Sequence, residues 1–156
     1  MTWEIKSFEE LTNLEWHEII KERMAVFVVE QDCAYMEIDG HDPASYHLFL
    51  KEGDEVVAYA RLMPSGTIYQ EASIGRIIVK ADQRGKGYAK EIMERGMKFL
   101  LNELGESEIK LQAEYYIKDL YASYEFEITS DIFLDEGIEH VYMLYRVPDK
   151  KKAEMK

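Results

Sequence analysis

This chain of 156 residues has one cysteine, a shortage of basic residues and no long apolar run. Because Cys33 stands alone, no disulfide within the chain is possible, and a free cysteine is expected to pack as a small buried hydrophobe. No apolar run approaches the roughly 20 residues that span a bilayer, and the N-terminus lacks the charged-then-apolar pattern of a secretory signal. The sequence therefore predicts a cytoplasmic protein with no membrane partner.

The shortage of positive charge excludes a second class of partner. The chain has 19 Lys and Arg against 31 Asp and Glu, a formal net charge of −12. Because a phosphate backbone is bound by a basic face, nucleic acid is not expected as a partner. Four basic residues nevertheless gather in one short segment, at Lys80, Arg84, Lys86 and Lys90. This local cluster in an acidic chain indicates a site for a small anion.

The composition is that of a packed globular protein. Hydrophobic residues make up 47% of the chain and aromatic residues 12%, and a chain of this length buries roughly 70% of its unfolded surface. We found no internal repeat or linker. The sequence predicts one domain over residues 1–147 and a frayed polar tail over 148–156.

The order of predicted elements indicates the fold class. Periodicity and turn residues predict helices over 14–29, 87–104 and 115–124 and strands over 3–6, 46–51, 55–63, 73–80, 108–113, 127–133 and 140–146. Three consecutive strands in the middle exclude a doubly wound alternation. We expect an α/β domain with a mixed, mostly antiparallel central sheet flanked by helices.

The segment from Ile77 to Ala89 has the properties of an anion site. A β-branched strand leads into a loop with Gly85 and Gly87, and an amphipathic helix follows. Unpaired amides and the dipole at a helix start favour negative charge, and the glycines allow close approach of the ligand. Lys86 precedes Gly87 without a following Ser or Thr, which excludes a Walker loop, and Lys90 breaks the dinucleotide fingerprint.

Three blocks resemble a known family. Arg84 to Ala89 fits R-x-x-G-x-A, which resembles the pyrophosphate loop of the GNAT superfamily of N-acetyltransferases. The segment 120–126 resembles the superfamily's pattern of Tyr, three residues, then Gly-Phe. The segment 23–31, together with Asp39-Gly40 and Asp42, is similar to the ElaA-like subgroup.

The resemblance implies a fold, a cosubstrate and site residues. The fold would be that of the acyl-CoA N-acyltransferases, and the cosubstrate would be acetyl-CoA, without a metal. Main-chain groups of Ile77, Ile78 and Val79 would pair with the pantetheine arm. Tyr121 would be the general acid for the departing thiolate, since a phenol stays protonated at neutral pH. The pyrophosphate would lie on the loop of Arg84, Gly85, Lys86, Gly87, Tyr88 and Ala89.

Two features leave the catalytic chemistry open. The superfamily pattern has Gly at position 125, where a helix ends in a left-handed turn, and this chain has Glu125, at a cost of roughly 1 kcal/mol or with a different turn. The acceptor amine must also lose a proton. His47, Glu30 and Glu114 are candidate bases, and we favour Glu30 or His47 acting through water.

Arg23, Asp39 and Asp42 permit two interpretations. They either form a buried ion network that fixes the loop after the first helix, or line an acceptor pocket for a cationic amine.

The favoured function is acetyl transfer from acetyl-CoA to a small-molecule or peptide amine, by direct attack in a ternary complex. One alternative is an acyl-CoA sensor without turnover, which Glu125 keeps open. A second, ranked lower, is an acyltransferase similar to acyl-homoserine-lactone synthases, which share Arg23, Phe27, Asp39 and Asp42. The oligomeric state is left open, with a homodimer among the options.

Overall fold

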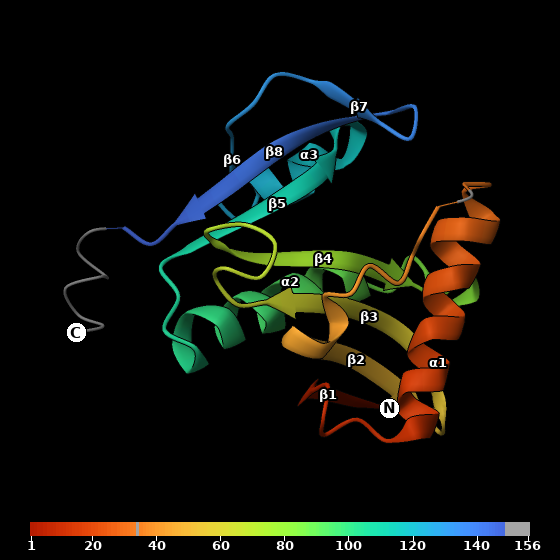
Figure 1. Cartoon of the computed structure of the whole chain (residues 1–156). Coiled ribbons are helices and arrows are strands. Elements are labelled where there is room, and N and C mark those ends of the chain that lie inside the picture. The colour runs from red at the N-terminus through yellow and green to blue at the C-terminus, as the bar shows by residue number, and fades with distance from the viewer. Residues whose placement is uncertain (34, 149–156) are drawn as a thin grey trace.

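The computed structural model describes residues 1–33 and 35–148 and shows one sheet with helices on both faces (Figure 1). The strand order is β1-β2-β3-β4-β5-β8-β6, and β7 pairs with β8. All neighbours are antiparallel except β4 and β5, so the predicted mixed, mostly antiparallel sheet is confirmed. The strands are β1 Thr2–Ser7, β2 Tyr46–Glu52, β3 Glu55–Met63, β4 Ala72–Val79, β5 Glu108–Glu114, β6 Glu127–Ile128, β7 Phe133–Asp135 and β8 Ile138–Arg146.

The helices lie where the apolar periodicity predicts them. Helix α1, Asn13–Arg23, continues as a π-helix over Met24–Glu30, and helix α2, Tyr88–Lys98, continues as a π-helix over Phe99–Glu103. The third predicted helix is shorter than expected: a 3-10 turn over Tyr115–Ile117 precedes α3, Lys118–Ala122. Further 3-10 turns lie at Asp42–Ala44 and Ala81–Gln83.

Helix α1 begins with a capping box. Thr12 Oγ1 accepts a bond from the Glu15 amide at 3.0 Å, and Glu15 Oε1 accepts one from the Thr12 amide at 2.9 Å. Ser7 and Glu10 also form reciprocal bonds, but these close a turn before the helix. The N-cap is Thr12, which has the extended backbone that this position requires.

Two cores hold the layers together. Helix α1 covers one face of the sheet over a cluster that includes Ile19, Phe49 and Tyr59. Helix α2 covers the other face over the larger core. At Gly96 a Cβ would lie 3.0 Å from Leu62 Cδ2, so the glycine allows α2 to approach the sheet closely. This packing fixes the start of α2 at the end of β4.

The pairing between β4 and β5 is short, and this opens the sheet. Only Ala72 and Ser73 pair with Ile109 and Lys110, and beyond them the strands diverge (Figure 1). Parallel neighbours need a crossover connection, which α2 supplies here. Strand β4 also carries an irregularity opposite Tyr59–Arg61, where Arg76 has φ 51°. The edge of β4 from Ile77 to Val79 is therefore left without a partner on the β5 side.

The predicted strand over 127–133 is wrong as a continuous element. Glu127–Ile128 and Phe133–Asp135 pair with separate parts of β8. Between them, the Tyr142 amide donates to the Ser130 hydroxyl at 2.9 Å in place of a backbone carbonyl. A side chain that substitutes for the ladder ends the strand. A tight turn at Glu136-Gly137 joins β7 and β8.

The sheet and its helices occupy residues within the predicted domain of 1–147. Most of the predicted tail lies outside the described residues, as 149–156 are not described. Within residues 1–33 and 35–148, none of the helices is long and apolar enough to cross a membrane.

Glu125 adopts the left-handed turn that the family pattern assigns to glycine, with φ 70°. The Phe126 amide donates to the Tyr121 carbonyl at 3.2 Å, which closes the turn at the end of α3. We predict that Glu125→Gly raises the free energy of unfolding by about 1 kcal/mol, because glycine adopts this conformation without a Cβ clash. Chemical denaturation measures the change.

Glu94→Gly is the matched control, since Glu94 is exposed within α2. There the same substitution should lower the stability by about 1 kcal/mol. A loss of stability in both variants would contradict the strain assigned to Glu125.

Candidate active site

The loop before α2 exposes its backbone amides. Gly85 and Gly87 have φ 81° and 84°, and a Cβ built at either position meets no atom within 4 Å. In the described chain, none of the amides from Gly85 to Ala89 donates to a protein group, and the first donor of the helix is Glu91, to the Gly87 carbonyl at 3.2 Å. These amides lie at the N-terminal end of α2, a helix of 11 residues. The loop therefore combines free donors, positive dipole and open space, as an anion site requires.

The Arg84 side chain connects this loop to β4 and to the π-helix after α1. Its Nε donates to the Val79 carbonyl at 3.0 Å, and its Nη2 lies 2.9 Å from Glu30 Oε2. Both side chains of this ion pair are exposed to solvent, so we expect it to contribute little stability. The Arg84 guanidinium spans from strand β4 to the end of the π-helix that follows α1.

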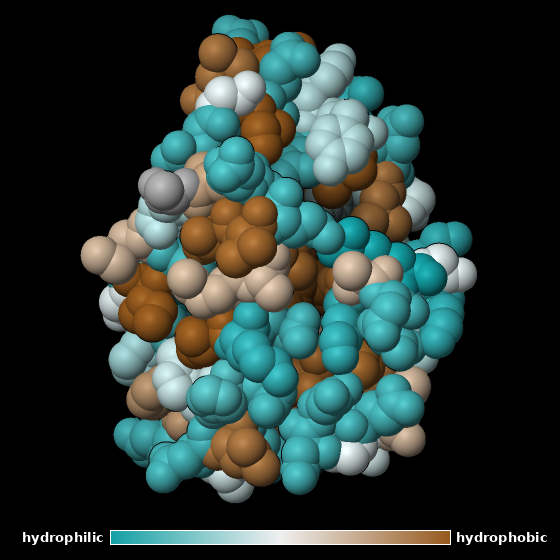
Figure 2. Space-filling model, turned by 90° about the vertical axis from the view of Figure 1, so that its right-hand side faces the viewer, coloured by the Kyte–Doolittle hydropathy of each residue, from teal (hydrophilic) through white to brown (hydrophobic). Residues whose placement is uncertain are grey.

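A cavity of about 890 Å³ lies where β4 and β5 separate. Figure 2 shows the side of the molecule on the right of Figure 1, where apolar side chains gather in the upper and left parts of a mostly hydrophilic face. The predicted residues that line the cavity are Glu30, Ile77, Ile78, Val79, Arg84, Gly85, Gly87, Tyr88, Ala89, Glu114 and Tyr121. The predicted residues that are not among its described lining are Arg23, Asp39, Asp42, His47 and Lys86.

Tyr121 lies on α3 at the wall of this cavity. Its side chain is 7% exposed and packs edge-on against Phe126. Burial, together with the nearby carboxylate of Glu114 and with Tyr116, raises the pKa of the Tyr121 hydroxyl to about 12. The phenol is therefore protonated at neutral pH and can act as a proton donor.

Arg23, Asp39 and Asp42 belong to a buried ion network. Arg23 Nη1 lies 2.7 Å from Asp42 Oδ1, and Arg61 Nη1 lies 3.0 Å from the same oxygen. Arg61 also holds both carboxylate oxygens of Asp39, at 2.9 and 2.8 Å. Burial would lower the pKa of the Arg23 guanidinium, but Tyr59 and the carboxylates of Asp42 and Glu37 raise it.

The network reaches the cavity directly through Arg61, which lines it, and also through Glu37. One oxygen of the buried Glu37 carboxylate accepts from Arg23 Nε at 2.6 Å and from Arg76 Nε at 2.9 Å. The other oxygen accepts from the Tyr35 hydroxyl at 2.6 Å. Tyr35 and Arg76 both line the cavity. The network thus fixes the loop between α1 and β2 and orients two side chains of the cavity wall.

His47 is enclosed within the protein. It is 0% exposed, and its two ring nitrogens lie 2.7 Å from the Tyr59 hydroxyl and 3.1 Å from the Asp42 carbonyl. Burial lowers its pKa to about 4, so the ring is neutral at neutral pH. Both nitrogens are used inside the core.

The cavity also contains residues that the sequence did not single out. Cys33, expected to be buried, is half-buried and lines it. Other such residues with polar or titratable groups include Tyr69, Arg76, Gln112, Asp135, Glu136 and His140. Strand alternation could have placed Gln112 on the same face as Glu114, but the other residues come from turns and strand ends whose meeting depends on the fold.

Comparison with known proteins identifies the family. The acetyltransferase (GNAT) domain family matches residues 13–147. The chain belongs to the GNAT acetyltransferase family. It is 36% identical to a UPF0039 protein of Synechocystis, over 95% of this chain and 97% of that protein. The family and the ElaA-like subgroup predicted from the sequence are both confirmed, and the protein is an acyltransferase that uses an acyl-CoA cosubstrate.

Solved structures show the same fold. An acyl-CoA N-acyltransferase from Pseudomonas aeruginosa superposes with a TM-score of 0.88 at 29% identity, covering 92% of this chain and 97% of that one. Escherichia coli ElaA superposes with a TM-score of 0.86 at 29% identity, covering 92% and 99%. The GNAT acyl-CoA N-acyltransferase fold is therefore confirmed.

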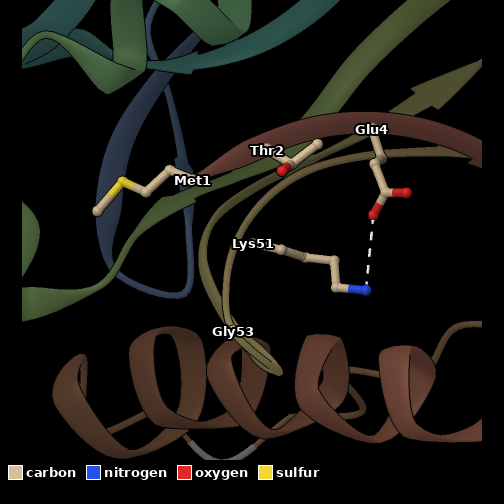
Figure 3. A pocket seen from close by; sticks show the side chains of 5 residues that line it. All are labelled: Met1, Thr2, Glu4, Lys51 and Gly53. Carbon is tan, nitrogen blue, oxygen red and sulfur yellow. Dashed lines mark ion pairs between the residues drawn. The ribbon is translucent and has the colours of Figure 1, made fainter.

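A second hollow, of about 330 Å³, lies at the β1 edge of this GNAT enzyme (Figure 3). Its lining includes Met1, Glu4 and Lys51, and the Glu4 and Lys51 side chains form an ion pair of 3.7 Å across it. None of the residues predicted for the active site lines this hollow.

The buried network predicts a large stability effect at Asp42. We expect Asp42→Asn to lower the free energy of unfolding by about 3 kcal/mol, because the buried guanidinium groups of Arg23 and Arg61 lose a shared carboxylate. Chemical denaturation measures the change. Asp54→Asn, in the exposed turn between β2 and β3, is the control and should change the stability by less than about 0.5 kcal/mol. Equal, small effects in both variants would show that the network is not needed for folding.

Proposed function

We propose that the protein is an acetyl-CoA-dependent N-acetyltransferase that acetylates a small-molecule or peptide amine by direct attack in a ternary complex. The observation that carries the proposal is one cavity with three parts. These are the free amides of the loop before α2, the unpaired edge of β4 at Ile77 to Val79, and the protonated Tyr121 hydroxyl.

The residues present fit the diphosphate of coenzyme A. Open space at Gly85 and Gly87 allows phosphate oxygens to approach the amides from Gly85 to Ala89. Exposed cationic side chains at Arg84 and Lys86 add positive charge. The free edge of β4 offers main-chain groups from Ile77 to Val79 to the pantetheine arm, as a strand edge does for an added strand.

The chemistry supplied by the cosubstrate is a thioester carbonyl that the amine nitrogen attacks. As the new C–N bond forms, the C–S bond breaks, and Tyr121 donates its hydroxyl proton to the departing sulfur. Burial of Tyr121 keeps this proton in place until sulfur accepts it. No covalent intermediate with the enzyme is required.

The acceptor would bind beside β5 and the turn between β7 and β8. Glu114, Asp135 and Glu136 bring carboxylates from these elements to the cavity, which favours a cationic amine. Two bases were favoured from the sequence. Glu30 lines the cavity, but its carboxylate accepts a hydrogen bond from Arg84, and His47 is enclosed in the core. Arg23, Asp39 and Asp42 would act indirectly, by holding the loop and Arg76.

A change at Gly87 tests the donor site. We predict that Gly87→Glu lowers coenzyme A affinity at least about 100-fold, because a carboxylate would occupy the space for phosphate and repel it. Isothermal titration calorimetry with coenzyme A measures the affinity.

Gly53→Glu is the control, since Gly53 also has a positive φ and no atom within 4 Å of its Cβ position, but lies in the turn between β2 and β3. Its affinity should equal that of the wild type. Equal affinity in Gly87→Glu would remove the loop from the donor site.

A change at Tyr121 tests the proton donor. We predict that Tyr121→Phe lowers kcat about 100-fold with nearly unchanged affinity for acetyl-CoA, because only the proton donor is lost. Free thiol released with a panel of amines follows the turnover. Tyr145→Phe, a buried tyrosine outside the described cavity lining, should leave kcat unchanged. Full turnover by Tyr121→Phe would assign the proton to another group.

The two alternatives differ in measurable products. An acyl-CoA sensor would bind coenzyme A but release no thiol with any amine. A protein similar to acyl-homoserine-lactone synthases would form a lactone, which mass spectrometry distinguishes from an N-acetyl amine. Turnover of acetyl-CoA with an amine and no lactone supports the proposed function against both.

A further inference from the structure

His140 is an imidazole of the main cavity that the sequence analysis did not select. It lies in β8, where it is the register partner of Glu114 on β5 and of Phe133 on β7. His140 and Glu114 both line the cavity that also contains Tyr121. The side chain is half-buried, so it is accessible to a molecule bound in the cavity.

The position of the proton on the His140 ring follows from its hydrogen bond. Nδ1 lies 2.7 Å from the carbonyl oxygen of Ile138. Because a carbonyl can only accept, Nδ1 must carry the hydrogen, and the neutral ring then has its lone pair on Nε2. The ring also stacks on Phe133, with centroids 6.0 Å apart and planes at 25°. Two contacts thus fix both the tautomer and the orientation of the ring.

The Nε2 atom of His140 is free to accept a proton. In the part of the chain that the structure describes, no hydrogen bond involves this atom. The bases favoured from the sequence lack this freedom: Glu30 holds Arg84 at 2.9 Å, and both ring nitrogens of His47 have partners. His140 is therefore the cavity imidazole whose basic nitrogen is available.

Three carboxylates come from the elements around His140. Glu114 faces it from β5, Asp135 comes from β7, and Glu136 lies in the turn between β7 and β8. Asp135 Oδ2 accepts from Gln112 at 2.6 Å. Arg76, a cationic lining residue on β4, is paired with Glu37.

We propose that His140 is the general base of the transfer reaction and removes a proton from the acceptor amine. This proposal rests on the proposed N-acetyltransferase function. An N–H bond of the acceptor breaks and a bond from this hydrogen to Nε2 forms, which leaves the nitrogen lone pair for attack on the thioester carbonyl. Tyr121 supplies the proton that the sulfur receives. The imidazolium then returns its proton to water, and the Tyr121 phenolate takes a proton from water, which restores both groups.

Steady-state kinetics of His140→Gln test the proposal, with acetyl-CoA and an amine that the wild type acetylates. We expect kcat/KM for the amine to fall at least about 100-fold, a typical effect of losing a general base. Coenzyme A affinity by calorimetry should stay within about twofold. The acidic limb of the wild-type pH profile of kcat/KM should be absent in the variant. His17→Gln, on the exposed face of α1, is the control and should match the wild type.

A measurement on the wild type covers the case in which His140→Gln does not fold. Long-range ¹H–¹⁵N spectra of the wild type at high pH report the histidine tautomers, and we expect the Nδ1–H form at His140. The Nε2–H form would overturn the proposal, because the lone pair would then lie on the nitrogen that faces Ile138.

Other results overturn it in distinguishable ways. Turnover of His140→Gln within about threefold of the wild type would exclude His140 as the general base and would leave the proposed function standing. A uniform loss at every pH with the acidic limb retained would show that His140 only positions other groups. A wild type that binds coenzyme A but acetylates no amine would overturn the proposed function, and the base role with it.

Discussion

The separation of β4 from β5 is the constraint on which the rest of this structure depends. The two strands share only the pairs at Ala72 and Ser73, so the backbone from Ile77 to Val79 is left with a free edge in the middle of the sheet. An unpaired edge inside a sheet costs hydrogen bonds, and a ligand that pairs with it would recover them. The same divergence opens the cavity between the loop before α2 and the short helix α3.

The packing on both faces holds this opening in place. Gly96 allows α2 to lie close to the sheet, which fixes the anion loop at its N-terminus. On the opposite face, the buried network of arginines and carboxylates fixes the loop after α1 and, through Glu37, orients Arg76 and Tyr35. Removing one partner from such a network lowers the free energy of unfolding. A change to the network would therefore affect both the stability of the protein and the cavity wall. The proposed donor side depends on backbone groups, whereas the proposed acceptor side depends on side chains brought together by the loops.

This difference explains how much of the site could be predicted from the sequence. The donor loop is a continuous segment with its own signature at Gly85 and Gly87, and the structure places it as predicted at the start of a helix. The order of strands and helices also followed from local patterns.

His140 and Asp135 have no such local signature, since they reach the cavity through pairing between strands that are far apart in the sequence. His47 lies in a strand, as predicted, but burial lowers its pKa, and part of that burial comes from Trp16 of α1, whose ring packs edge-on against it. The interruption between β6 and β7 was missed because the hydroxyl of Ser130 takes the place of a backbone group.

We propose that the loop amides and the free edge of β4 bind one coenzyme A molecule. Amide chemical shifts of the ¹⁵N-labelled protein, followed during titration with coenzyme A, report this binding residue by residue. We expect the largest shifts at Gly85 to Ala89 and at Ile77 to Val79, and we expect them to saturate together. Saturable shifts confined to other parts of the chain, such as the hollow around Met1 and Lys51, would contradict it.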